Sequence, residues 1–163
     1  MKYRATGKLV VKARSSVHDT TTVWDKITGD VDADPEAIEQ ATASFSVDMT
    51  AFDAGDFLKN RKLRKDFALE AHPTASFALT GLGDVVRSAT TFTATARGTL
   101  DWRGTQIELV LAGRGTLDDM RVEASARFEL DIRRLGLSAP RFLMFKVEDE
   151  VTVEVAIRGA VVT

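Results

Sequence analysis

The stretch RVEASARFELDIR, residues 121–133, alternates without a break between small or apolar side chains and polar, mostly charged ones. Val122, Phe128 and Ile132 belong to the apolar set, whereas Arg121 and Glu123 belong to the polar set. Successive side chains of a β-strand point to opposite faces of the sheet, so this spacing places all apolar residues on one face. The stretch therefore predicts a long strand that buries a single face.

The same pattern recurs along most of the chain. It is found again in residues 8–14, 42–49, 91–103 and 147–158. Shorter strands are expected near residues 20–31, 75–80, 83–88 and 105–113. The turn residues at 103–104 and 117–119 separate consecutive strands, as they do in an antiparallel meander, and the glycines at 81–83 and 113–115 are also expected between strands. The sequence thus indicates an all-β protein.

Strands with one apolar face must pack as two sheets or close into a barrel, and closure removes exposed strand edges. The residues at positions 94, 96, 98, 124 and 126 of the apolar faces are Ala or Gly, and such small residues leave room in the interior. A barrel of about eight strands can be filled by side chains or can hold one small ligand. We predict an eight-stranded antiparallel barrel with space in its lumen.

The apolar faces of these strands supply the candidate ligand-binding residues. The predicted lumen set is Val11, Phe45, Val47, Phe92, Ala94, Leu109, Ala124, Phe128, Val153 and Val155.

Length and composition limit the alternatives. The chain has 163 residues, which suits a single domain over residues 1–163. A net charge of −2 argues against general nucleic-acid binding. No cysteine is present, so disulfides and thiolate metal sites are excluded, and the redox compartment is left undecided. No membrane span or signal peptide is visible, which favours the cytoplasm, or the periplasm if the start has been trimmed.

Catalytic and metal motifs are not apparent. His18 and His72 are the two histidines, and neither has the spacing of a zinc motif. No nucleophile elbow or phosphate-binding loop follows a strand. We therefore expect no enzymatic activity, no metal and no cofactor. Trp24 and Trp102 are expected in the barrel wall, each with one partner for its indole N–H.

The segment DAGDFLKNRKLRKDFALEAHPTASF, residues 53–77, interrupts the alternation. Asp53 and Asp56 can cap a helix over about residues 55–68, and Pro73 forces an extended backbone before the next strand. Five of the seven residues from 59 to 65 are basic. They form either a solvated helix face or a cationic rim for an anionic head group, in which Lys59, Lys62 and Arg64 would take part.

A second irregular stretch, LGLSAPRFLMFKV at 135–147, contains an apolar run after Pro140. Phe142, Met144 and Phe145 either plug one end of the barrel or form a ligand entrance that can touch a membrane.

Several motifs together resemble the YceI-like family. Asp53-Ala54-Gly55, Lys59-Asn60, Lys62-Leu63-Arg64, Asp66-Phe67, His72-Pro73 and Phe77 follow the spacing of its pattern D-T-G, R-D, H-L-R-S, D-F, Y-P and a strand Phe. Further matches are Ile27-Thr28-Gly29-Asp30-Val31 with Asp34-Pro35, Gly98-Thr99-Leu100 with Trp102-Arg103-Gly104, and Val147-Glu148-Asp149-Glu150-Val151. The resemblance extends from about Lys8 to Ile157.

This resemblance implies a lipocalin-like, eight-stranded barrel with a helix beside it, and a polyisoprenoid or similar amphiphile in the lumen. The chain departs from the pattern at Lys59-Asn60, Lys62 and His72, which changes polar residues that could touch a head group. The expected function is therefore a non-enzymatic carrier of an isoprenoid or other long amphiphilic lipid. The alternative is a protein-interaction or dimerisation module with a filled barrel, acting as a pathway accessory.

Overall fold

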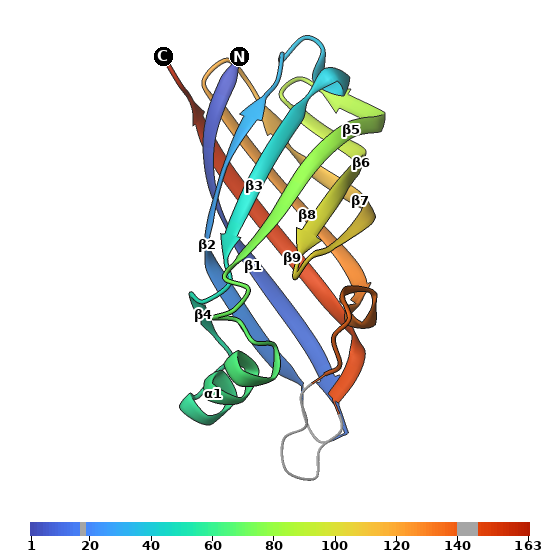
Figure 1. Cartoon of the computed structure of the whole chain (residues 1–163). Coiled ribbons are helices and arrows are strands. Elements are labelled where there is room, and N and C mark those ends of the chain that lie inside the picture. The colour runs from blue at the N-terminus through green and yellow to red at the C-terminus, as the bar shows by residue number, and fades with distance from the viewer. Residues whose placement is uncertain (17–18, 140–146) are drawn as a thin grey trace.

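Antiparallel strands and one α-helix make up the computed structural model, which describes residues 1–16, 19–139 and 147–163 (Figure 1). The strands are β1 (Lys2–Ser15), β2 (Thr20–Asp32), β3 (Thr42–Asp48), β4 (Phe52–Asp53), β5 (Thr74–Ser88), β6 (Thr91–Trp102), β7 (Thr105–Leu117), β8 (Arg121–Asp131) and β9 (Val147–Val161). The helix is α1 (Phe57–Asp66), and two short 3-10 helices are η1 (Ile38–Gln40) and η2 (Ile132–Leu135).

The sheet closes on itself because β1 has two partners. Its neighbours follow the order β1-β9-β8-β7-β6-β5-β3-β2, and β1 also pairs with β2. Every pairing is antiparallel, and the short β4 pairs with Val23 and Trp24 of β2 outside the closed ring of eight strands. The predicted eight-stranded antiparallel barrel with one flanking helix is thus confirmed. The helix expected over about 55–68 spans 57–66.

Two boundaries predicted from glycines are wrong. The expected strands at 75–80 and 83–88 are one bent strand, β5, whose register against β6 shifts between Leu79 and Gly81 and again between Gly83 and Val86. Glycine suits such bulges because no side chain has to be placed there. The strand expected at 105–113 likewise runs on to Leu117. A Cβ at Gly115 would lie 2.0 Å from the Glu123 carbonyl oxygen, so this glycine permits a close strand approach and marks no turn.

The helix α1 forms where its own side chains can satisfy its first turn. Asp56 accepts a hydrogen bond from the Lys59 amide at 2.8 Å, as an N-cap does. Gly55 takes a positive φ of 114°, which suits glycine, and its amide donates to Asp53 at 2.9 Å. Leu63 is buried one turn before Phe67 in the same apolar cluster, so the helix docks through this face.

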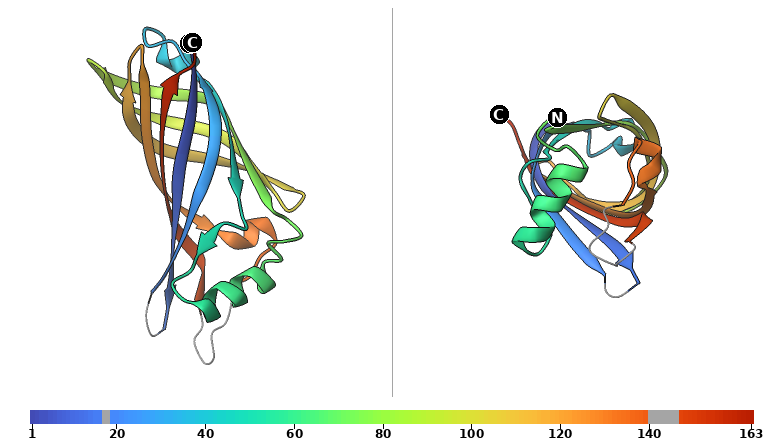
Figure 2. Two further views of the ribbon diagram at one scale, coloured as in Figure 1. Left: turned by 90° about the vertical axis from the view of Figure 1, so that its left-hand side faces the viewer. Right: turned by 60° about the horizontal axis from the view of Figure 1, so that its bottom comes forward.

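We call the barrel end that carries both chain termini the upper end and the end that carries α1 the lower end (Figure 1). Figure 2 shows α1 lying to one side of the lower mouth, with η2 on the other side. Within the described residues, no helix is long and apolar enough to cross a membrane.

Candidate functional site

The barrel lumen encloses a cavity of about 330 Å³. Its described wall is apolar except for Arg114 and Ser125, which face each other across the β7–β8 pairing. Ligand pockets usually measure about 300–1,000 Å³ and combine an apolar lining with a few polar groups, so this cavity lies at the small end of that range. An apolar lining of this kind favours a hydrocarbon ligand.

The cavity is long and narrow. Ala33 and Leu117 line it near the upper end, and Ile132 and Leu137 line it near the lower end. Along β2 it reaches from Trp24 to Val31, which is roughly 23 Å of strand at about 3.3 Å per residue. This shape fits an extended chain better than a compact ring system.

All ten residues of the predicted lumen set line this cavity, from Val11 on β1 to Val155 on β9. Their contact with a ligand stays a prediction. The structure adds a larger group that sequence reasoning did not select. Among its aromatic and long aliphatic members are Leu9, Trp24, Phe67, Phe77, Leu79, Leu82, Leu100, Trp102, Leu111 and Leu130. Strand alternation could have found most of these, whereas Phe67 follows the helix and reaches the lumen through tertiary packing.

The upper end is closed by hydrogen bonds to backbone carbonyls. The Arg87 guanidinium donates to the carbonyl oxygens of Pro35 and Leu117, and its Nε donates to Ala89 at 3.0 Å. The fully buried Tyr3 donates its hydroxyl to the Asp118 carbonyl at 2.7 Å. Burial, with a smaller effect from nearby aspartates, raises the pKa of Tyr3.

The lower end is closed by α1, η2 and the loops beside them. A smaller cavity of about 70 Å³ lies there and shares five lining residues with the lumen. Leu63 and Phe67 line one side of it, while Ala139 and Val147 lie on the other. The smaller cavity therefore adjoins the lumen, with Phe67 in the wall that the two share, and reaches the buried side of α1.

Both tryptophans occupy this lower region and find the partners expected for them. The indole N–H of Trp24 donates to the Met49 carbonyl at 3.1 Å, and that of Trp102 donates to the His72 carbonyl at 3.0 Å. His72 thus contributes backbone groups here: its carbonyl accepts from Trp102, and its amide donates to the Ala68 carbonyl at 3.1 Å. Within the described residues, no group of three or more metal-ligating side chains comes together.

The predicted cationic rim lies on α1, but two of its members already have carboxylate partners. Lys62 forms an ion pair with Asp66 at 2.9 Å, and the Arg64 Nε lies 3.6 Å from Glu70. Arg64 also stacks over the Phe52 ring at 5.2 Å, and its buried Nε makes no hydrogen bond to any described residue. Lys59 belongs to the first turn of the helix.

Three of the predicted residues cannot be placed. Phe142, Met144 and Phe145, predicted as an entrance or a plug, lie outside the described residues, as does His18.

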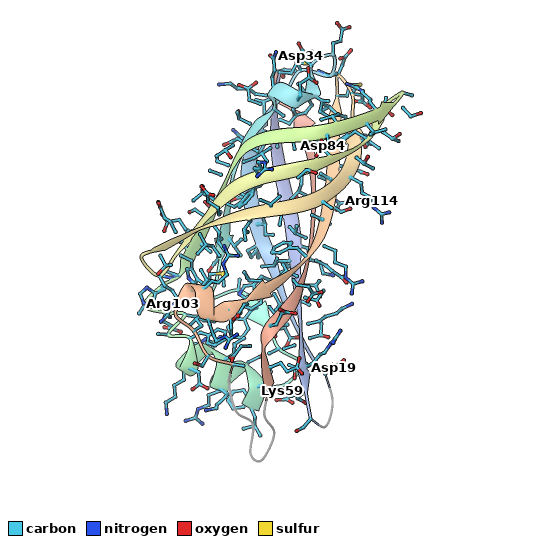
Figure 3. The ribbon with its side chains drawn as sticks, turned by 90° about the vertical axis from the view of Figure 1, so that its right-hand side faces the viewer. Asp19, Asp34, Lys59, Asp84, Arg103 and Arg114 are labelled. Carbon is cyan, nitrogen blue, oxygen red and sulfur yellow. The ribbon has the colours of Figure 1, made fainter. Side chains whose placement is uncertain are left out.

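The barrel wall is not uniform. β7 and β8 pair only from Gly113↔Ala126 to Leu117↔Val122, although β7 begins at Thr105 and β8 ends at Asp131. Figure 3 shows β5, β6 and β7 running across the barrel while β8, β9 and β1 descend toward the lower end, where β8 leads into η2. In the unpaired part, the Arg134 side chain donates to the Glu108 carbonyl at 2.9 Å, and Leu135 is buried in the lumen lining.

A larger hollow of about 970 Å³ lies against the wall formed by β1 and β5 to β9. It is more open to solvent than the lumen and contains charged side chains of both signs, among them Lys8, Arg114 and Glu123. A hydrocarbon in such an open, charged hollow would remain partly in contact with water, so the lumen is the better candidate for a hydrophobic ligand.

Solved structures share this fold across almost the whole chain. The crystal structure of BcnA from Burkholderia cenocepacia is 18% identical, with a TM-score of 0.76 over 93% of this chain and 95% of that one. A polyisoprenoid binding domain from Saccharophagus degradans is 14% identical, with a TM-score of 0.77 over 99% and 98%. The YCEI protein of Campylobacter jejuni is 12% identical, with a TM-score of 0.67 over 87% and 85%.

At these identities the similarity establishes the fold alone. A search of curated proteins found no match to this chain. The model of the YceI-like domain, however, matches residues 5–158. The chain therefore belongs to the YceI-like family.

Proposed function

We propose that this protein is a non-enzymatic carrier that holds an isoprenoid or similar long-chain amphiphile in the barrel lumen. The observation that carries the proposal is the cavity of about 330 Å³ with an almost wholly apolar lining. The family membership and the similarity to a polyisoprenoid binding domain agree with it. An open lumen also favours the carrier over the alternative of a side-chain-filled interaction module.

The energetics are sufficient for such a role. Burying roughly 300 Å² of a hydrocarbon chain at about 25 cal/mol per Å² contributes about 7 kcal/mol before the costs of association. The lining offers almost no polar partner, so the head group would leave the lumen at one end. At the lower end, Arg64 is held by the Phe52 ring and by Glu70, and its guanidinium could serve a phosphate or carbonyl oxygen if the ligand took the place of that carboxylate.

The first test is to denature the purified protein, extract it with organic solvent and analyse the extract by mass spectrometry. A stoichiometric isoprenoid or quinone would establish the carrier and name its ligand. An empty extract, together with no uptake of added prenyl lipids, would overturn the proposal.

Substitutions inside the lumen provide the second test. Phe128→Asp should abolish uptake of a fluorescent prenyl probe, because it places a charge against a hydrocarbon chain. Ala94→Phe should weaken uptake at least about tenfold by filling the cavity without adding charge, so it separates loss of binding from loss of folding. The control is Arg127→Ser, on the exposed face of β8, which should bind as the wild type does. Unchanged uptake by both lumen variants would show that the ligand binds elsewhere.

A further inference from the structure

The outer face of α1 combines two features that are rare together on a protein surface. Phe57 and Leu58 are 75% and 74% exposed, although large apolar side chains are usually buried. They are followed by five basic residues before the single acidic residue of the helix, Asp66.

Helical spacing gathers these side chains on one side. At 100° per residue, Phe57, Arg61 and Lys65 are spaced at i, i+4 and i+8, and Leu58 projects beside Lys65. All four are exposed. The docking residues Leu63 and Phe67 lie on the opposite side and are buried. The helix thus has one face committed to the barrel and another, both apolar and basic, turned to solvent.

The acidic residues that the structure describes on and near α1 do not pair with the basic residues of this outer face. Lys62 is neutralised by Asp66, and Arg64 by Glu70, whereas neither Arg61 nor Lys65 takes part in an ion pair within the described part of the chain. Asp53 and Asp56 precede the helix, where they accept hydrogen bonds from Gly55, Lys59 and Asn60, and neither forms an ion pair with Arg61 or Lys65 among the described residues. In a chain of net charge −2, this face is a local cationic surface.

We propose that the outer face of α1, defined by Phe57, Leu58, Arg61 and Lys65, docks the lower end of the barrel onto a bilayer that contains anionic lipids. Phe57 and Leu58 enter the boundary between head groups and acyl chains, while Arg61 and Lys65 lie against the phosphates, as in interfacial amphipathic helices. A second copy of the chain is a poorer occupant, because two such faces would oppose like charges.

The outer face of α1 lies at the lower end of the barrel (Figure 1), where a lipid could enter the lumen. Below the lumen, the smaller cavity reaches the buried side of α1 through Leu63 and Phe67. Docking would place this end of the lumen nearest to the bilayer from which a lipid is taken. That purpose rests on the proposed carrier function, but the docking itself can be measured without any ligand in the lumen.

The experiment is co-sedimentation of the intact protein with vesicles of phosphatidylcholine alone or with about one third phosphatidylglycerol. The wild type should bind the anionic vesicles and release them at high salt. Phe57→Ser/Leu58→Ser should lower the partition coefficient at least about tenfold. Arg61→Gln/Lys65→Gln should lower it by about fivefold for each charge removed.

Matched controls alter similar side chains elsewhere. Val110→Ser/Met120→Ser removes two exposed apolar residues, one from β7 and one from the turn between β7 and β8. Arg97→Gln/Arg121→Gln removes two exposed charges, and both double variants should bind as the wild type does. The proposal is overturned if the wild type ignores the anionic vesicles, if the α1 variants bind them equally well, or if Phe57→Ser/Leu58→Ser abolishes a dimer while vesicle binding is unchanged.

Uptake of a prenyl probe in vesicle-free buffer separates this proposal from the carrier function. Both α1 double variants should retain uptake, because none of the four residues lines the lumen. Docking without uptake would contradict the carrier alone, and uptake without docking would contradict the α1 surface alone.

Discussion

The β1–β2 and β7–β8 pairings complete the same barrel in different ways. β1 and β2 stay paired from Lys2↔Asp32 to Ala13↔Thr20, with one register shift between Gly7 and Leu9. β7 and β8 pair through only five residues at the upper end and then separate. Below that point, the wall between them is completed by η2, through Leu135 and the Arg134 contact to Glu108.

This difference shows that the barrel has one seam held by backbone hydrogen bonds and another held partly by side chains. Backbone pairing resists substitution unless the strands are forced apart, whereas side-chain packing depends on the volume and charge of each residue. The β7–β8 seam is therefore the part of the wall where single substitutions should be most informative.

The largest effect is expected in the short paired part of this seam. In Gly115→Ala, the new Cβ would meet the Glu123 carbonyl oxygen at 2.0 Å and the Ala124 Cα at 2.9 Å, so the two strands must move apart. We expect a loss of about 3 kcal/mol or more in the free energy of unfolding, measured by urea denaturation. The control is Gly113→Ala, where the nearest atom lies at 3.6 Å, and a change within about 1 kcal/mol is expected. Equal effects at both positions would contradict this account of the seam.

An intermediate effect is expected below the paired part of β7 and β8, where side chains of η2 take the place of backbone hydrogen bonds between the strands. Leu135 is only 4% exposed and borders the lumen, so Leu135→Ala should lower the free energy of unfolding by about 2 kcal/mol, near the lower end of the range for buried leucines, because the new space joins an existing cavity. Leu58→Ala, at a leucine that is 74% exposed, should change stability by less than about 0.5 kcal/mol. If the two leucines behaved alike, η2 would not contribute to the seam.

The smallest effect concerns pH. Hydrogen bonds from the Arg133 side chain and amide lower the pKa of Asp131, the residue that joins β8 to η2. A carboxyl group whose pKa is lower in the folded state stabilises the fold above its unfolded pKa of about 3.9, and this contribution is lost as the pH falls through the folded pKa.

The melting temperature should accordingly fall less between pH 5 and pH 2 in Asp131→Asn than in the wild type. Arg133→Gln should reproduce part of the change, because it removes the side-chain donor and leaves the amide. A wild-type pH profile in both variants would show that this pair does not support the seam.

Local chemistry made much of the fold predictable. The alternation at 121–133 identified β8, although the strand ends two residues earlier, at Asp131, just before η2 begins. The caps at Asp53 and Asp56 located α1 to within two residues at either end. The lumen set was found for the same reason, since alternation assigns each side chain to a face once the inward face is known. Glycines were wrongly predicted to end strands at Gly81 and Gly115, because the first marks a bulge within β5 and the second permits the close approach of β7 and β8.

The sequence by itself determined that this protein is made of one-faced antiparallel strands with a single basic helix, because those properties depend on neighbours within a few residues. Only the tertiary structure decided the rest. The partners of β1, the early end of the β7–β8 ladder, the cavity of about 330 Å³ and the outward position of Phe57 and Leu58 all depend on contacts between distant segments. Strand alternation fixes which way a side chain points, but register and packing fix what it meets there.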